Sequence, residues 1–75
     1  MQDVDIDRLF PGQEEIEPDL ELIKFGYATI MKGYYTSNFS KLMGMLKYII
    51  NSGNIKDYKE EYYLLYRIYQ KLNSK

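Results

Sequence analysis

The sequence predicts an all-α fold, a small three-helix domain preceded by an extended acidic N-terminal arm. Three observations predict it. Apolar residues recur at helical spacing in three separate segments. No segment shows the period-two alternation, bounded by turn residues, that is typical of strands. Apolar residues make up 45% of the chain, which is a globular composition. The predicted division is an arm over residues 1–17 and a three-helix body over residues 18–75.

The first predicted helix spans residues 18–34. Pro18 suits the first turn of a helix, and the carboxylates around it favour the positive end of the helix dipole. We expect Gly26 to allow close packing against another helix and Gly33 to weaken the C-terminal end. The apolar stripe that predicts this helix consists of Leu20, Ile23, Tyr27, Ile30, Met31 and Tyr34.

The second predicted helix spans residues 38–51 and has the clearest apolar periodicity. Three residues before it offer side-chain acceptors for an N-cap, namely Thr36, Ser37 and Asn38. Gly53 suits the left-handed conformation that ends a helix. The apolar positions are Phe39, Leu42, Met43, Leu46, Ile49 and Ile50.

The third predicted helix spans residues 57–73, and Asp57 with Glu60 three residues later resembles a capping box. Its apolar stripe consists of Tyr58, Tyr62, Leu65, Tyr69 and Leu72. A helix this rich in tyrosine cannot bury every ring on one face, so we expect an outward-facing interface on it. The residues expected there are Tyr63, Tyr66 and Arg67.

The composition argues against an enzyme. The chain has no Cys and no His, which excludes Ser-His and Cys-His catalysis and Cys/His zinc sites. The acidic residues lack the spacing of a calcium loop, and the glycines form no phosphate-binding loop. We therefore expect no catalytic residues, no cofactor and no metal.

The size and the N-terminus predict the setting of the protein. A core of 75 residues without disulfides usually leaves only about 3–5 kcal/mol of net stability, so we expect self-association, in the simplest case a homodimer. No apolar run approaches the ~20 residues of a membrane span. The acidic N-terminus lacks the features of a secretory signal. A soluble cytoplasmic protein is expected.

Charge is divided unevenly along the chain. Residues 1–21 hold eight acids against one base, a net charge of −7, whereas residues 22–75 hold nine bases against three acids, a net charge of +6. The arm is either a solubilising tail or a row of carboxylates that imitates the phosphates of a DNA duplex. In the second case it would bind a basic host protein that handles DNA. The candidate contact residues are Asp3, Asp5, Asp7, Glu14, Glu15 and Glu17.

The arm also contains a short peptide motif. Ile6-Asp7-Arg8-Leu9-Phe10 resembles the linear peptide with which replication and repair proteins enter a pocket of the bacterial sliding clamp, a motif that ends in Leu-Phe. The leading Gln of that motif is missing, because Gln2 lies too far upstream. Leu9 and Phe10 either bind a partner pocket or anchor the arm to its own body.

In size and charge layout the chain resembles the small host-takeover proteins of phages that infect low-GC Gram-positive bacteria, in particular the staphylococcal-phage inhibitors of the DNA polymerase sliding clamp. The resemblance implies an inhibitor that binds the clamp, in one arrangement as a dimer in its DNA channel, and prevents its loading onto DNA. Two alternatives stay open. One is a regulatory module that dimerises through its tyrosine-rich third helix. The other, less favoured because the acidic arm would repel phosphates, is direct nucleic-acid binding.

Overall fold

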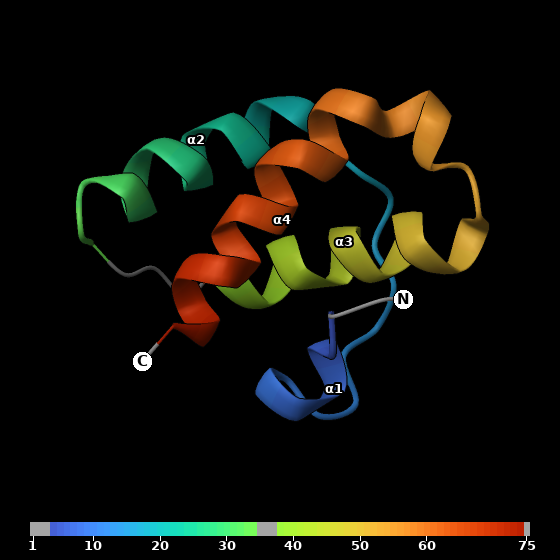
Figure 1. Cartoon of the computed structure of the whole chain (residues 1–75), viewed down its shortest axis with the longest axis horizontal. Helices are drawn as coiled ribbons and strands as arrows, with labels where there is room; N and C mark the ends of the chain where they lie inside the picture. Colours follow the sequence, from blue (N-terminus) through green and yellow to red (C-terminus); the bar gives the residue numbers. More distant parts are fainter. Residues whose placement is uncertain (1–3, 35–37, 75) are drawn as a thin grey trace.

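The computed structural model describes residues 4–34 and 38–74, without the side chain of Leu9. It confirms the predicted fold class, a compact all-α globule with three main helices (Figure 1). No strand occurs in the described residues, and none of their helices has the length and apolarity to cross a membrane. The elements in chain order are α1 (Ile6–Leu9), α2 (Leu20–Met31), α3 (Phe39–Ser52), a 3₁₀ turn (Ile55–Tyr58) and α4 (Lys59–Asn73).

Helix α2 is shorter at both ends than the predicted range of 18–34. It begins after Asp19, whose carboxylate accepts a hydrogen bond from the N–H of Leu22 at 3.4 Å, so the acid and not Pro18 sets the start. It ends because Gly33 takes a φ of +91°, a left-handed conformation that favours glycine. The predicted extension to residue 34 was therefore wrong.

Helix α3 follows its prediction closely. Asn38 occupies the N-cap position but makes no side-chain capping hydrogen bond, and the other predicted cap candidates, Thr36 and Ser37, lie outside the described residues. Gly53 ends the helix with a φ of +74°, as its left-handed preference predicts. The helix runs one residue further than expected, to Ser52.

The capping box predicted for the third helix was wrong. Asp57 lies inside the 3₁₀ turn, and its N–H donates to the carbonyl of Asn54 at 3.0 Å. The N-cap position of α4 is Tyr58, and the helix begins at Lys59, two residues later than predicted. The chain after Gly53 forms a 3₁₀ turn over Ile55–Tyr58. Because Asp57 is part of this turn, it does not lie at the N-cap position of α4.

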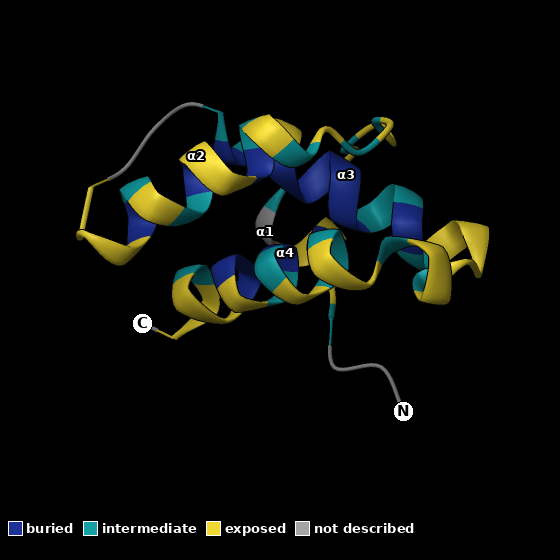
Figure 2. Ribbon diagram, turned by 90° about the horizontal axis from the view of Figure 1, so that it is seen from above, coloured by how far each residue is buried: buried dark blue, intermediate teal, exposed yellow. Residues whose placement is uncertain are grey.

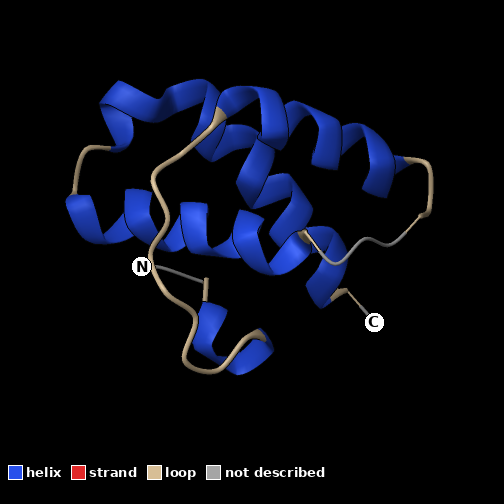
Figure 3. Ribbon diagram, turned by 180° about the vertical axis from the view of Figure 1, so that it is seen from behind, coloured by secondary structure: helices blue, strands red, loops and turns tan. Residues whose placement is uncertain are grey.

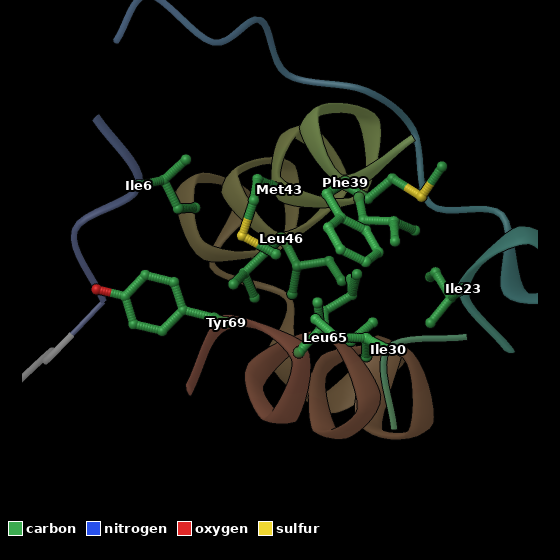
Figure 4. Close-up of a cluster of buried hydrophobic side chains, with 12 residues drawn as sticks. Ile6, Ile23, Ile30, Phe39, Met43, Leu46, Leu65 and Tyr69 are labelled. Carbon is green, nitrogen blue, oxygen red and sulfur yellow. The ribbon is translucent and has the colours of Figure 1, made fainter. Parts of the chain in front are cut away.

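The core lies where α2 and α4 meet α3, which runs in the opposite direction to both (Figure 1). Figure 2 shows that the buried residues gather on α3 and on the inner sides of its neighbours. Gly26 permits the close approach of α2 predicted for it, because a Cβ there would lie 2.4 Å from Leu42 Cδ1. The core side chains are Ile6, Ile23, Ile30, Phe39, Leu42, Met43, Met45, Leu46, Ile49, Leu65, Ile68 and Tyr69, most of which are labelled in Figure 4.

Candidate functional site

The acidic arm folds onto α3. After the short helix α1, the chain crosses α3 as an irregular segment and reaches α2 on the far side (Figure 3). The Ile6 side chain is only 6% exposed and belongs to the core, and Val4, Phe10 and Ile16 pack against it. These four apolar side chains of the arm therefore pack on the body of the same chain.

A polar stripe on α3 holds the middle of the arm. Ser40, Gly44, Lys47 and Asn51 follow one another at helical spacing and therefore share one face of α3. The N–H of Ile16 donates to the Gly44 carbonyl at 3.1 Å. A Cβ at Gly44 would lie 2.6 Å from the backbone oxygen of Glu14, so only glycine allows the two backbones to approach this closely.

The other members of the polar stripe bind side chains and carbonyls of the arm. Gln13 is held twice, because its side-chain oxygen accepts from the Ser40 hydroxyl at 2.5 Å and its carbonyl accepts from Lys47 Nζ at 2.8 Å. Lys47 also forms an ion pair with Asp7 at 3.3 Å. Asn51 Nδ2 donates to Glu15 Oε2 at 2.8 Å. This stripe was not predicted from the sequence, although polar residues at helical spacing within an apolar helix are a signal for a covering segment.

The beginning of the arm is tied to α4. The backbone N–H of Asp5 donates to the Tyr69 hydroxyl at 2.8 Å, and Arg8 Nη2 donates to the side-chain oxygen of Asn73. Tyr69 is only 3% exposed, so its hydroxyl reaches the arm from within the core (Figure 4). The arm therefore contacts both α3 and α4.

The carboxylates predicted to bind a partner are exposed wherever the structure describes them. Asp7 is 67% exposed although it pairs with Lys47, and Glu15 is exposed although it accepts from Asn51. The contacts thus fix the arm without covering its charge. The other exposed candidates are Asp5, Glu14 and Glu17, while Asp3 lies outside the described residues.

The Leu9-Phe10 pair lies at the C-terminal end of α1. The N–H of Phe10 donates to the carbonyl of Ile6 at 2.8 Å, and its half-buried ring packs against the core. The backbone of Leu9 belongs to α1, and its side chain is outside the described set. Phe10 therefore contacts its own body, as the anchoring alternative expects.

The three residues expected on the outer face of α4 do not form one cluster. Tyr63 is 56% exposed, and Arg67 lies beside it, with Nη1 donating to the Tyr63 hydroxyl at 2.9 Å. The guanidinium carbon is 5.7 Å from the centre of the Tyr63 ring, a cation–π distance. Tyr66 is half-buried and stacks on Tyr62 and Tyr69, with ring centres 5.9 and 6.5 Å apart.

Two tyrosine hydroxyls titrate above their ordinary range. Burial raises the pKa of Tyr62, and the neighbouring Tyr66 raises it further. Burial also raises the pKa of Tyr58, with a smaller contribution from Tyr48, whose ring meets it edge to face at 6.3 Å. Both groups stay protonated at neutral pH, so these rings contribute packing and hydrogen bonds but no charge.

A pocket of about 210 Å³ lies between α1 and α3. It is lined by Val4, Asp5, Ile6, Asp7, Lys47, Ile50 and Asn51. Two of the lining residues are acidic, Asp5 and Asp7, and the Lys47 ammonium pairs with Asp7. Within residues 4–34 and 38–74, no three acidic side chains converge as metal ligands would. The pocket therefore adds to the acidic surface of the arm.

The fold defines the class of the molecule, a compact all-α globule whose acidic N-terminal segment is fastened across its central helix. No family model matches the chain, and the comparisons with curated proteins and with solved structures find no match either.

Proposed function

We propose that this chain is an inhibitory protein-binding module that presents carboxylates to the basic DNA-binding surface of a bacterial replication protein. The sliding clamp is the particular partner we propose, with the chain blocking the access of the clamp to DNA. One observation carries this function: the described carboxylates of the arm stay exposed while the backbone beneath them is fixed on α3.

Fixation of the arm favours a binding surface over a solubilising tail. A tail needs only charge, whereas Gln13, Glu15 and Ile16 are each held by a specific contact with α3. Carboxylates on a fixed backbone lose less conformational freedom when they bind, so more of their interaction energy appears as affinity. A basic surface that binds a DNA duplex also attracts a row of carboxylates electrostatically, and at low salt this attraction acts over a long range.

The carboxylates support binding in the DNA channel of the clamp better than binding in its peptide pocket. Entry of Leu9-Phe10 into a pocket would require Phe10 to leave the core and its N–H to give up the Ile6 carbonyl. Opening α1 would also uncover Ile6, which is buried. The exposed carboxylates need no such rearrangement.

The test is a titration of the full chain against a purified sliding clamp from a low-GC Gram-positive bacterium. We expect binding that weakens steeply with salt and that duplex DNA in the channel prevents. The variant Glu14→Gln/Glu15→Gln/Glu17→Gln should lose at least about tenfold in affinity, or about 1.4 kcal/mol. The matched control Asp57→Asn/Glu60→Gln/Glu61→Gln removes as many charges outside residues 1–17 and should bind like the unmodified chain.

Two results would contradict this function. If the control loses as much affinity as the arm variant, net charge and not the arm determines binding. If the clamp does not bind, and affinity capture from the bacterial lysate recovers no replication or transcription protein at low and moderate salt, the proposed class of partner is wrong.

A further inference from the structure

The outer face of α4 carries a basic and aromatic surface that the proposed function does not use. Arg67 and Lys71 line a shallow groove together with Gln70 and with Met31 of α2, and we call these four residues the basic groove. The exposed Tyr63 ring lies beside it and accepts a hydrogen bond from Arg67 Nη1 at 2.9 Å. This contact orients the guanidinium and leaves its other N–H groups available for a carboxylate.

The chain around the basic groove supplies no carboxylate. Neither residues 22–56 nor residues 62–75 contain an Asp or Glu. In the described part of the chain, the recorded ion pair joins Lys47 to Asp7, on the side of the arm. Arg67 and Lys71 therefore have no ion-pair partner among the described residues, so carboxylates of a second molecule can pair with them.

The arm presents such carboxylates on the opposite side of the molecule. Figure 1 shows the arm behind α3 and α4 in front of it, and Figure 3, seen from behind, shows the arm crossing in front of α3. Glu14, Glu15 and Glu17 are exposed on this segment. The exposed carboxylates therefore belong to a segment that crosses α3, whereas the basic groove is lined by residues of α2 and α4.

We infer that the basic groove binds the arm of a second copy of this chain, with Glu14, Glu15 and Glu17 of one copy facing Arg67 and Lys71 of the next. Because two different surfaces meet, the contact is head to tail, and every open assembly leaves one arm and one groove free. The expected products are short open chains of copies instead of a symmetric dimer.

Two other occupants fit the charge pattern less well. A nucleic-acid backbone would bring its phosphates toward a molecule whose first 21 residues carry a net charge of −7, and it would be repelled by them. A foreign acidic peptide would compete with an arm that is present at the same concentration as the groove. The second copy is therefore the occupant that the charges favour.

Self-association of this kind uses carboxylates that the proposed function also uses. A basic partner protein that binds the arm would therefore separate the copies, whereas the basic groove would stay free. The inference does not depend on the proposed function, because the groove can be altered without touching the arm. Substitutions at Arg67 and Lys71 should abolish self-association and leave partner binding unchanged at concentrations where the unmodified chain is monomeric.

The test reverses the charges of the basic groove and of the arm in separate variants, and sedimentation of the full chain measures self-association. At about 0.01 M ionic strength, where charges act over about 30 Å, the average mass should rise above 9.0 kDa with concentration. At about 1 M it should fall back to the monomer. Arg67→Glu/Lys71→Glu and Glu14→Lys/Glu15→Lys/Glu17→Lys should each lose the association. An equimolar mixture of the two variants should regain it.

The control is Lys41→Glu/Lys56→Glu, which reverses two exposed lysines away from the groove and should keep the concentration dependence. Circular dichroism confirms that each variant is folded. A wild-type chain that stays monomeric at low salt, a mixture that stays monomeric, or a control that loses association equally would overturn the inference. So would an oligonucleotide or an acidic peptide that binds through Arg67 and Lys71 when the chain itself does not associate.

Discussion

The backbone N–H of Ile16 donates a hydrogen bond to the Gly44 carbonyl at 3.1 Å, and this bond fixes the arm at the middle of α3. A side chain at position 44 would shield that carbonyl. The missing Cβ lets the arm come close, since an added Cβ would lie 2.6 Å from the Glu14 oxygen and 2.9 Å from Ile16 Cδ1. Glycine at position 44 lowers the helix propensity of α3, but it allows the backbones of α3 and the arm to approach closely.

We predict that Gly44→Ala destabilises the protein by about 1–3 kcal/mol, because the backbone at Glu14 has to shift to accommodate the methyl group. Inside a helix with free space, the same substitution stabilises by about 1 kcal/mol. A decrease in the free energy of unfolding therefore indicates the close backbone contact, whereas an increase indicates helix propensity alone. Urea unfolding followed by circular dichroism measures it.

The matched control for Gly44→Ala is Gly26→Ala, which also adds a methyl group inside a helix. Its Cβ would meet Leu42 Cδ1 at 2.4 Å in the core between α2 and α3. Both variants should be less stable, but only Gly44→Ala should speed cleavage after Glu14 by a Glu-specific protease in native buffer. A stabilised Gly44→Ala variant with an uncleaved arm would contradict the proposed approach of the backbones.

The fold class could be predicted from the sequence because it depends on local apolar periodicity. The stripe from Phe39 to Ile49 is buried as expected, since α3 has neighbours on several sides. Helix ends were harder to predict, because neighbouring residues compete for the same cap. Asp57 offered a plausible capping box, yet the 3₁₀ turn after Gly53 included it.

The path of the arm could not be predicted, because polar contacts between distant residues determine it. Lys47 and Asp7 are separated by 40 residues, and Asn51 and Glu15 by 36. The arm has no apolar period of its own that would indicate which side of it is buried. The sequence therefore predicted which carboxylates were candidates, but not that Lys47 and Asn51 would hold two of them.

We predict that stability decreases at alkaline pH because of Tyr58 and Tyr62. Burial raises the pKa of both hydroxyls, with further contributions from Tyr48 and Tyr66. The folded state then holds these protons more firmly than the unfolded chain, whose tyrosines titrate at about 10. The stabilising contribution is complete below pH 10 and is lost as the pH rises through the raised values.

The ultraviolet absorbance of tyrosinate measures this effect. In the native chain some of the nine tyrosines should ionise above the pH at which all nine ionise in urea. Tyr62→Phe should remove part of the late-titrating fraction. Coincident native and unfolded titration curves would contradict the prediction.

We predict that Lys47→Met destabilises the protein more than Asp7→Asn. Lys47 Nζ lies 3.3 Å from Asp7 Oδ1, but it also donates to the part-buried Gln13 carbonyl at 2.8 Å. An exposed ion pair contributes at most about 1 kcal/mol and is screened by salt. The loss of a charged donor to a part-buried carbonyl costs about 1.5–3 kcal/mol.

Urea unfolding at low and high salt should show a small, salt-sensitive loss of stability for Asp7→Asn and a larger loss for Lys47→Met that persists in salt. Equal losses for the two variants would mean that the ion pair, and not the carbonyl contact, holds this part of the arm.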